Sequence, residues 1–217
     1  GGITCFDKDI EKFLPVRFDK PLELKDILDF CWNDGSLYLV TSQGLFESRI
    51  VRKTEGKHDF VLCLLNPEPV VRGKVAHLCS DGKTNLYFSV NQRKVVHYDL
   101  VAKKTSLIKE YSVVNRLFLR HGYLWICRLW DDIICYDLKT NEERVISMEG
   151  KDQSEFSNSY VTELVLKDNR TFYLTTWNGL YKLRFDNDNL CKSPFVLTLL
   201  TKNEKAFHSS IENKMTS

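Results

Sequence analysis

Phe172–Phe185 (FYLTTWNGLYKLRF) is one of four copies of a fourteen-residue block, and the copies align without a gap. The others are Leu37–Ile50 (LYLVTSQGLFESRI), Leu86–Asp99 (LYFSVNQRKVVHYD) and Leu124–Asp137 (LWICRLWDDIICYD). The second position is aromatic in every copy, although only 12% of the chain is aromatic. Successive copies start 49, 38 and 48 residues apart. A strand-like repeat of this period is typical of stacked β-sheet units, each too small to bury its own faces.

The sequence around each block predicts a complete four-stranded unit. Val161–Leu166 and the polar turn Lys167-Asp168-Asn169 precede Phe172–Phe185, and the apolar run Phe195–Leu200 follows it. Tight turns are expected at these polar clusters because Asn, Asp and Gly tolerate positive φ. The order strand, turn, strand, turn, strand, loop, strand predicts an antiparallel blade, and the whole chain an all-β β-propeller fragment. We expect the innermost strands near Leu28–Trp32, Ala76–Ser80, Arg116–Leu119 and Glu163–Leu166.

Both ends of the chain look like parts of further blades. Gly2–Asp7 matches the second half of a block, and Ile211–Ser217 looks like the opening strand of another blade. The predicted blades are 1–24 (partial), 25–70, 71–111, 112–158, 159–206 and 207–217 (partial). We therefore expect an excised portion of a larger propeller. Its open strand edges would be covered by another copy of the chain or left strained.

Charge and hydropathy exclude some partners. Lys and Arg total 31 and Asp and Glu 29, with both signs interspersed, so the basic footprint of a nucleic-acid-binding protein is missing. Apolar stretches such as Phe195–Leu200 have strand length, so no direct membrane insertion by this segment is expected.

The seven cysteines form no C-x-x-C pair, and no Cys/His spacing suits zinc. Most lie in predicted strands, where free cysteine behaves as a small hydrophobe, so we interpret them as packing residues. Their number alone favours a reducing compartment. Neither a metal nor a cofactor is predicted.

No catalytic constellation stands out. The five histidines are isolated, and there is no G-x-S-x-G elbow, phosphate-binding loop or dinucleotide fingerprint. Asp131-Asp132 is the most suggestive carboxylate pair, but its place between two strands favours a hairpin corner. The chain is therefore predicted to bind rather than to catalyse.

The best candidate binding residues lie in the turns between second and third strands, which gather on one face of a propeller. Indole, guanidinium and amide groups together suit a polyhydroxylated ligand. Indole rings stack on the C–H faces of sugars, while guanidinium and amide groups form hydrogen bonds with the hydroxyls. The candidates are Arg93, Arg128, Trp130, Trp177 and Asn178. Alternatively, Trp130 and Trp177 fold back between blades. Trp32 and Trp125 lie within strands and are expected to pack between blades.

The block resembles the two-component regulator propeller repeat, whose second strand reads roughly L-W-I-G-T and is followed by x-x-G-L. Phe172–Tyr181 is most similar, and Leu37–Phe46 keeps Thr41, Gly44 and Leu45 at the matching places. The block departs from the motif where Arg93 and Asp131 replace the corner glycine.

This resemblance implies the periplasmic sensor of a bacterial hybrid two-component receptor. In that family two propellers precede a small β-sandwich, a membrane span and cytoplasmic kinase and regulator parts. The implied ligand is a glycan-derived oligosaccharide, and the implied signal is a rearrangement of a receptor homodimer. Two alternatives remain: a cytoplasmic propeller scaffold that docks proteins, and a propeller carbohydrate lyase or hydrolase.

Overall fold

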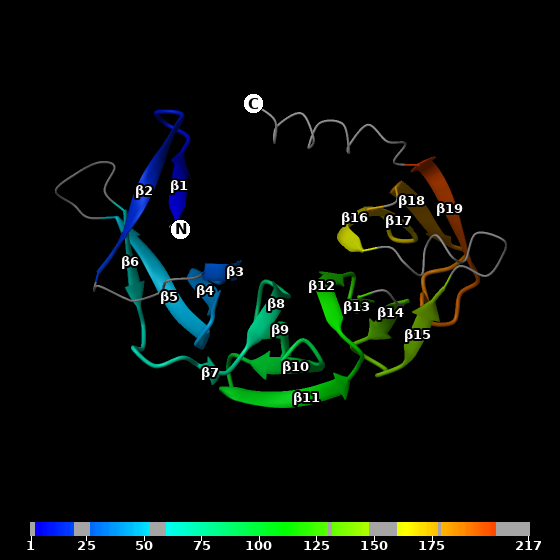
Figure 1. Ribbon diagram of the computed structural model, residues 1–217, viewed down its shortest axis with the longest axis horizontal. Coiled ribbons are helices and arrows are strands. Elements are labelled where there is room, and N and C mark those ends of the chain that lie inside the picture. Colours follow the sequence, from blue (N-terminus) through cyan, green and yellow to red (C-terminus); the bar gives the residue numbers. More distant parts are fainter. Residues whose placement is uncertain are drawn as a thin grey trace, which may run out of the picture. The chain divides into compact units, whose positions relative to one another are not determined.

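The computed structural model describes residues 3–19, 27–52, 60–129, 132–147, 160–177 and 179–202. The regular elements in these ranges are all β-strands, and none of the ranges contains a helix that could cross a membrane. The chain divides into two compact units, Gly1–Tyr111 and Ser112–Ser217 (Figure 1). The predicted all-β propeller fragment is confirmed.

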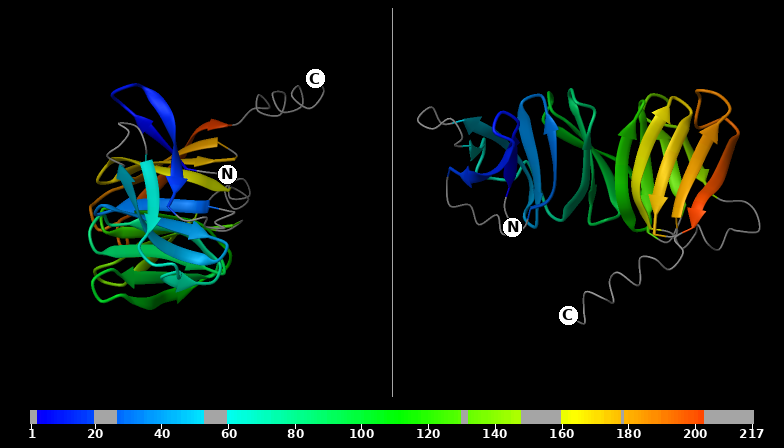
Figure 2. Two further views of the ribbon diagram at one scale, coloured as in Figure 1. Left: turned by 90° about the vertical axis from the view of Figure 1, so that its left-hand side faces the viewer. Right: turned by 90° about the horizontal axis from the view of Figure 1, so that it is seen from above.

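The Ser112–Ser217 unit consists of two four-stranded antiparallel sheets whose strands follow chain order. The first sheet comprises Val114–Arg120 (β12), Tyr123–Arg128 (β13), Ile133–Asp137 (β14) and Glu143–Ile146 (β15). The second comprises Val161–Asp168 (β16), Thr171–Thr176 (β17), Gly179–Phe185 (β18) and Phe195–Lys202 (β19), which run side by side in Figure 2. In both of these sheets the fourteen-residue block forms the second and third strands, as predicted.

The Gly1–Tyr111 unit contains one regular four-stranded sheet and one seven-stranded sheet. The regular sheet comprises Val75–Ser80 (β8), Asn85–Val90 (β9), Lys94–Asp99 (β10) and Lys104–Glu110 (β11). The larger sheet contains Ile27–Asn33 (β3), Ser36–Thr41 (β4), Gly44–Arg52 (β5) and Phe60–Leu64 (β6), with the short strand Val71–Arg72 (β7) also paired to β5. The hairpin of Thr4–Asp7 (β1) and Lys12–Phe18 (β2) completes it, because β2 pairs in parallel with β6.

The predicted innermost strands correspond to β3, β8, β12 and β16. Each lies at one edge of its sheet and is the first strand of its blade, because the second and third strands follow it in order. The predicted opening strand Ile211–Ser217 lies outside the described residues.

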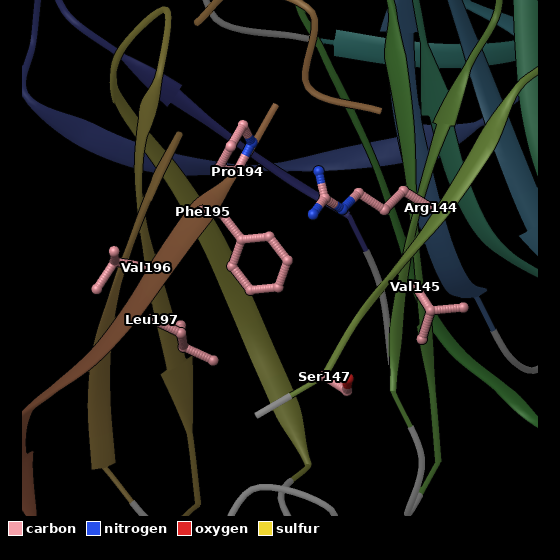
Figure 3. Close-up of a pocket in the computed structure, with 7 residues that line it drawn as sticks. All are labelled: Arg144, Val145, Ser147, Pro194, Phe195, Val196 and Leu197. Atoms are coloured by element: carbon pink, nitrogen blue, oxygen red, sulfur yellow. The ribbon is translucent and has the colours of Figure 1, made fainter. Parts of the chain in front are cut away.

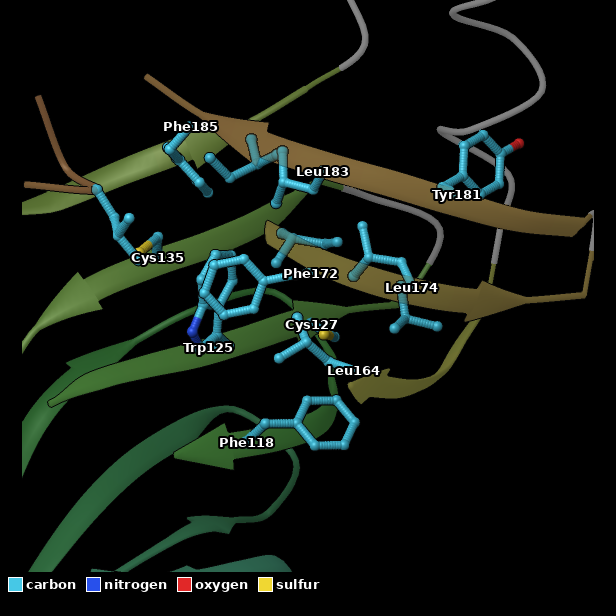
Figure 4. Close-up of a cluster of buried hydrophobic side chains, with 14 residues drawn as sticks. Phe118, Trp125, Cys127, Cys135, Leu164, Phe172, Leu174, Tyr181, Leu183 and Phe185 are labelled. Carbon is cyan, nitrogen blue, oxygen red and sulfur yellow. The ribbon is translucent and has the colours of Figure 1, made fainter. Parts of the chain in front are cut away.

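Aromatic packing between the two sheets forms the core of the Ser112–Ser217 unit (Figure 4). Trp125 on β13 is fully buried, and its ring centroid lies 4.7 Å from that of Phe172 on β17. Leu164 on β16 is buried in the same cluster. Trp125 therefore packs between blades, as predicted.

Alternate side chains of β3 have opposite environments. Asp29 Oδ2 accepts a hydrogen bond from Leu78 N at 2.9 Å, and Asn33 Nδ2 donates to Lys83 O at 2.9 Å. These residues face the β8–β11 sheet, so the alternate residues face away from it. Those residues are Leu28, Phe30 and Trp32, which we call the β3 stripe, and all three are exposed. The prediction that Trp32 packs between blades is therefore wrong for the described residues, where its exposed fraction is 56%.

Candidate ligand-binding site

The five candidate residues fall into three groups. Arg128 ends β13 and Trp177 directly follows β17, so both belong to the Ser112–Ser217 unit. Arg93 lies in the β9–β10 turn of the other unit and is exposed. Trp130 and Asn178 lie outside the described residues.

Arg128 and Trp177 lie at the same end of neighbouring sheets. Arg128 is paired with Val114 at the start of β12, and Thr176, next to Trp177, is paired with Val161 at the start of β16. The buried amide of Asn115 joins these two strand starts, because its Nδ2 donates to Val161 O at 2.9 Å. The structure therefore brings two of the predicted corners to one end of the unit, as the propeller interpretation requires.

Trp177 presents an open aromatic surface. Its exposed fraction is 60%, and its ring stacks on that of Tyr160 with centroids 5.0 Å apart and an angle of 23° between planes. The Trp177 backbone N–H also donates to Tyr160 O at 3.2 Å. The indole is thus supported from one side while much of it faces solvent, which differs from the alternative of a ring folded away between blades.

Arg128 is held by its own turn. Its guanidinium lies 3.7 Å from the Asp132 carboxylate, and its Nε donates to Asp132 O at 3.4 Å. Only 18% of the Arg128 side chain is exposed. Such a partly exposed pair contributes little to stability by itself, but it restricts the direction of the guanidinium. Asp132 therefore has a local structural role, in keeping with the hairpin corner that the sequence predicts.

Two corners share a threonine-based turn. Thr176 Oγ1 accepts a hydrogen bond from Gly179 N at 3.2 Å and donates to Gly179 O at 3.1 Å. In the β4–β5 turn, Thr41 Oγ1 donates to Gly44 O at 3.2 Å. This side-chain bond closes a tight corner, and the described residues at the two tips, Ser42, Gln43 and Trp177, are exposed.

Sequence reasoning missed Tyr160 and Asn115. Tyr160 immediately precedes β16. An aromatic residue just before a strand is only a weak signal of the stacked pair that Tyr160 forms with Trp177. Asn115 lies at a bulge in the pairing of β12 with β13, where the amide turns to the next sheet. Nothing in the alternation of apolar residues marks that bulge.

A groove lies between the outer strands β15 and β19 (Figure 3). Its volume is 520 Å³, and its walls include Arg144, Val145 and Ser147 on one side and Phe195 and Leu197 on the other. The Arg144 guanidinium carbon lies 4.8 Å from the centroid of the Phe195 ring. A guanidinium against an aromatic ring is a second place where a polar ligand with apolar faces could bind.

A more polar cleft lies at the opposite end of the β16–β19 sheet from Trp177, around the β16–β17 turn. It has a volume of 650 Å³ and is lined by charged residues of both signs. Arg170 Nε and Asp188 Oδ1 are 3.3 Å apart there. Because Arg170 is already paired with a carboxylate and the cleft offers no stacked aromatic pair among the described residues, we regard it as a weaker candidate than the aromatic surface at Trp177.

The comparisons with known proteins identify a fold. No protein-family model matches the chain, and no curated protein sequence matches it. The extracellular domain of BT4673 from B. thetaiotaomicron, a protein described as a one-component system, is similar over 89% of this chain with a TM-score of 0.66 and 14% identity. A second structure of that domain, described as part of a hybrid two-component system, is similar over 76% of this chain with a TM-score of 0.53.

A protein with a different description is also similar. PorZ, a bacterial surface component of the type-IX secretion system of Porphyromonas gingivalis, is similar over 94% of this chain, with a TM-score of 0.56 and 14% identity. The chain spans 27% of the length of the first BT4673 structure and 24% of that of PorZ. At these identities the likeness establishes the fold, a portion of a β-propeller, and leaves function to be argued from the site.

Proposed function

We propose that this chain is part of a ligand-sensing propeller in the periplasmic region of a bacterial two-component receptor. Its fold is similar to an extracellular domain described as part of a hybrid two-component system. Its repeat resembles the propeller repeat of such receptors. In this proposal the propeller binds a ligand and performs no chemistry, and any kinase activity belongs to another part of the receptor.

The exposed Tyr160–Trp177 pair is the observation that carries the proposal. A large indole with 60% of its surface exposed is costly in water unless a ligand or partner covers it. The ring is already supported by Tyr160, so binding would need little reordering of the indole. A flat aromatic face with a guanidinium at the same end of the unit suits a sugar, whose C–H face stacks on the ring while its hydroxyls accept hydrogen bonds.

The proposed ligand is therefore an oligosaccharide derived from glycan breakdown. Trp177 would stack on one sugar ring, and Arg128 would bind hydroxyls at the same end of the unit. Arg93, Trp130 and Asn178 are proposed to extend this recognition surface. Binding would then change the packing of sensor domains in a receptor homodimer, and that change would be transmitted across the membrane.

Substitution of Trp177 tests the proposal. We expect Trp177→Ala to weaken oligosaccharide binding by about 1–3 kcal/mol, because the variant loses a stacking surface in the binding site. Isothermal titration calorimetry against a panel of oligosaccharides released from plant and host polysaccharides measures the effect. Phe13→Ala is a matched control, since Phe13 is also an exposed aromatic residue but lies on β2. Equal binding by wild type, Trp177→Ala and Arg128→Ala would place recognition elsewhere.

A second candidate function is that of a protein-docking propeller. The β3 stripe favours it, because Leu28, Phe30 and Trp32 form an exposed apolar row on one strand. The two functions differ in where substitutions act. Replacing Phe30 would abolish docking and leave sugar binding unchanged, whereas replacing Trp177 would do the reverse.

A further inference from the structure

Two of the seven cysteines lie in contact across a blade boundary. Cys135 is on β14 and fully buried, whereas Cys191 lies in the β18–β19 loop and is partly exposed. The Cys191 thiol donates to the carbonyl oxygens of Cys135 and Glu142, with a sulfur–oxygen distance of 3.5 Å in each case. The contact joins residues 56 positions apart in the chain. Both thiols are free in this structure.

The two thiols have opposite acidities. The hydrogen bond from the Cys135 thiol lowers the pKa of Cys191, and a backbone N–H from Asp137 acts in the same direction. That hydrogen bond, together with burial, raises the pKa of Cys135. A lowered pKa increases the thiolate fraction, and the thiolate is the reactive form of cysteine. Because Cys191 is partly exposed and Cys135 is fully buried, an external disulfide would react first with Cys191, and Cys135 would follow as the resolving thiol.

The loop that carries Cys191 is fixed to the β12–β15 sheet by contacts independent of the cysteines. Tyr123 Oη donates to Asp188 O at 3.1 Å and accepts from Leu190 N at 3.3 Å. Lys192 Nζ lies 2.7 Å from Glu142 Oε1. Arg144 also donates to Ser193 O. Because these contacts hold the loop on both sides of Cys191, little chain entropy remains to be lost when the two sulfurs bond.

We propose that Cys135 and Cys191 form a reversible disulfide that joins the two blades of the Ser112–Ser217 unit. The oxidant is an external disulfide, either of low molecular weight or carried by a thiol–disulfide oxidoreductase. The Cys191 thiolate attacks one sulfur of that disulfide and releases the other as a thiolate, which gives a mixed disulfide. Cys135 then loses its proton and attacks the Cys191 sulfur, expelling the second thiolate. Two protein thiols lose two electrons and two protons, and the external disulfide is reduced to two thiols.

The disulfide would act beside the groove between β15 and β19. Arg144 on one wall contacts both Phe195 on the other wall and Ser193 in the loop next to Cys191. Joining Cys191 to Cys135 would fix the spacing of the two walls (Figure 3). The inference does not depend on the proposed sensing function.

The test uses the 217-residue protein equilibrated in glutathione buffers of increasingly oxidising composition. Free thiols are blocked with N-ethylmaleimide, and peptides are mapped by mass spectrometry without reduction. We expect a cross-linked Cys135–Cys191 peptide in oxidising buffers and its loss on reduction. The midpoint of thermal unfolding should rise by at least about 5 °C on oxidation. Cys5→Ser should behave as wild type, since Cys5 lies on β1 in the Gly1–Tyr111 unit.

Cys191→Ser should lose both the cross-link and the oxidation-dependent rise in the midpoint. The proposal is overturned if the wild-type protein gives no Cys135–Cys191 peptide in the most oxidising buffer. It is also overturned if the peptide forms without any change in the unfolding midpoint. The wild-type peptide map decides the first point even if Cys191→Ser fails to fold.

Discussion

At the scale of single residues, the corner glycines of the repeat are required by a close approach of backbones. Gly44 and Gly179 hold the same position in their blocks, with φ of 143° and 154°. A methyl group added to Gly44 would lie 2.1 Å from Val71 O, and one added to Gly179 would lie 2.1 Å from Thr201 O. Both glycines therefore let a neighbouring strand pass next to the turn. The blocks that lack this glycine have Arg93 and Asp131 in its place.

Gly179→Ala should therefore destabilise the protein strongly. We expect a loss of about 3 kcal/mol or more in the free energy of unfolding, because unfavourable φ and a clash with backbone add together. Gly122→Ala is the matched control: Gly122 also has positive φ, but nothing lies within 4 Å of the added methyl group. It should cost only about 1–2 kcal/mol. Urea unfolding measures both, and equal losses would contradict the role given to the close approach.

The residues of the candidate site were only partly predictable from sequence. The sequence places Trp177 in a short turn between apolar strands, but it leaves open whether the ring is exposed or folded back between blades. Its partner Tyr160 could not be predicted, because it lies in a different segment from Trp177 and the stacking of the two rings is a tertiary contact. The prediction for Trp32 was wrong for a related reason. Its strand was correctly predicted, but the face of that strand that a neighbouring sheet covers is decided by tertiary packing.

At the scale of elements, aspartates stabilise the turns that join the strands. Asp99 ends β10, and its Oδ1 accepts hydrogen bonds from Ala102 N at 2.9 Å and Val101 N at 2.8 Å. These backbone donors, with Ala102 the stronger, lower the pKa of Asp99 below its ordinary value. The stabilisation is present above the unfolded pKa of about 3.9 and is lost as the pH falls through the lower pKa of the folded state.

Asp99→Asn should therefore make the free energy of unfolding depend less on pH in the acidic range. We expect the variant to lose less unfolding free energy than wild type between pH 7 and about pH 3, because it has no carboxylate to protonate at this turn. Urea unfolding at both pH values measures the difference. Asp34→Asn, a substitution at an exposed aspartate in the β3–β4 turn, is the control. A wild-type pH dependence in Asp99→Asn would show that this turn does not contribute to it.

Strand order within a blade follows from the sequence, but the pairing of β2 with β6 does not. The four strands of each blade are adjacent in the chain, so alternation and turn residues predict them. By contrast, β2 and β6 are separated by three other strands and pair in parallel, from Val16 with Phe60 to Phe18 with Leu62. No local signal identifies such a pair, because its register is set by packing against the rest of the sheet.

At the scale of the whole molecule, the β3 stripe is an apolar sheet face that is exposed in the described part of the chain. Phe30 is paired with Leu39, the third residue of its block, and Leu164 is paired with Leu174, the third residue of another block. Leu164 is fully buried by the adjacent blade, whereas Phe30 is 63% exposed. The β1–β2 hairpin contributes Val16 to the core on the same side of the sheet, yet Phe30 stays exposed. The position of Phe30 therefore corresponds to a position that a neighbouring blade buries at Leu164. A second apolar sheet face of the same kind could cover Phe30.

In a solution of this chain alone, a second copy can supply that face, so we expect self-association through the β3 stripe. Phe30→Ser should weaken it about tenfold or more, because an aromatic side chain at the centre of an interface carries much of the binding free energy. Val101→Ser is the control, since Val101 is 77% exposed in a turn outside the stripe. Sedimentation velocity across a wide concentration range measures the association. A wild-type chain that stays monomeric throughout, or a Phe30→Ser variant that associates as strongly, would exclude the β3 stripe as the contact surface.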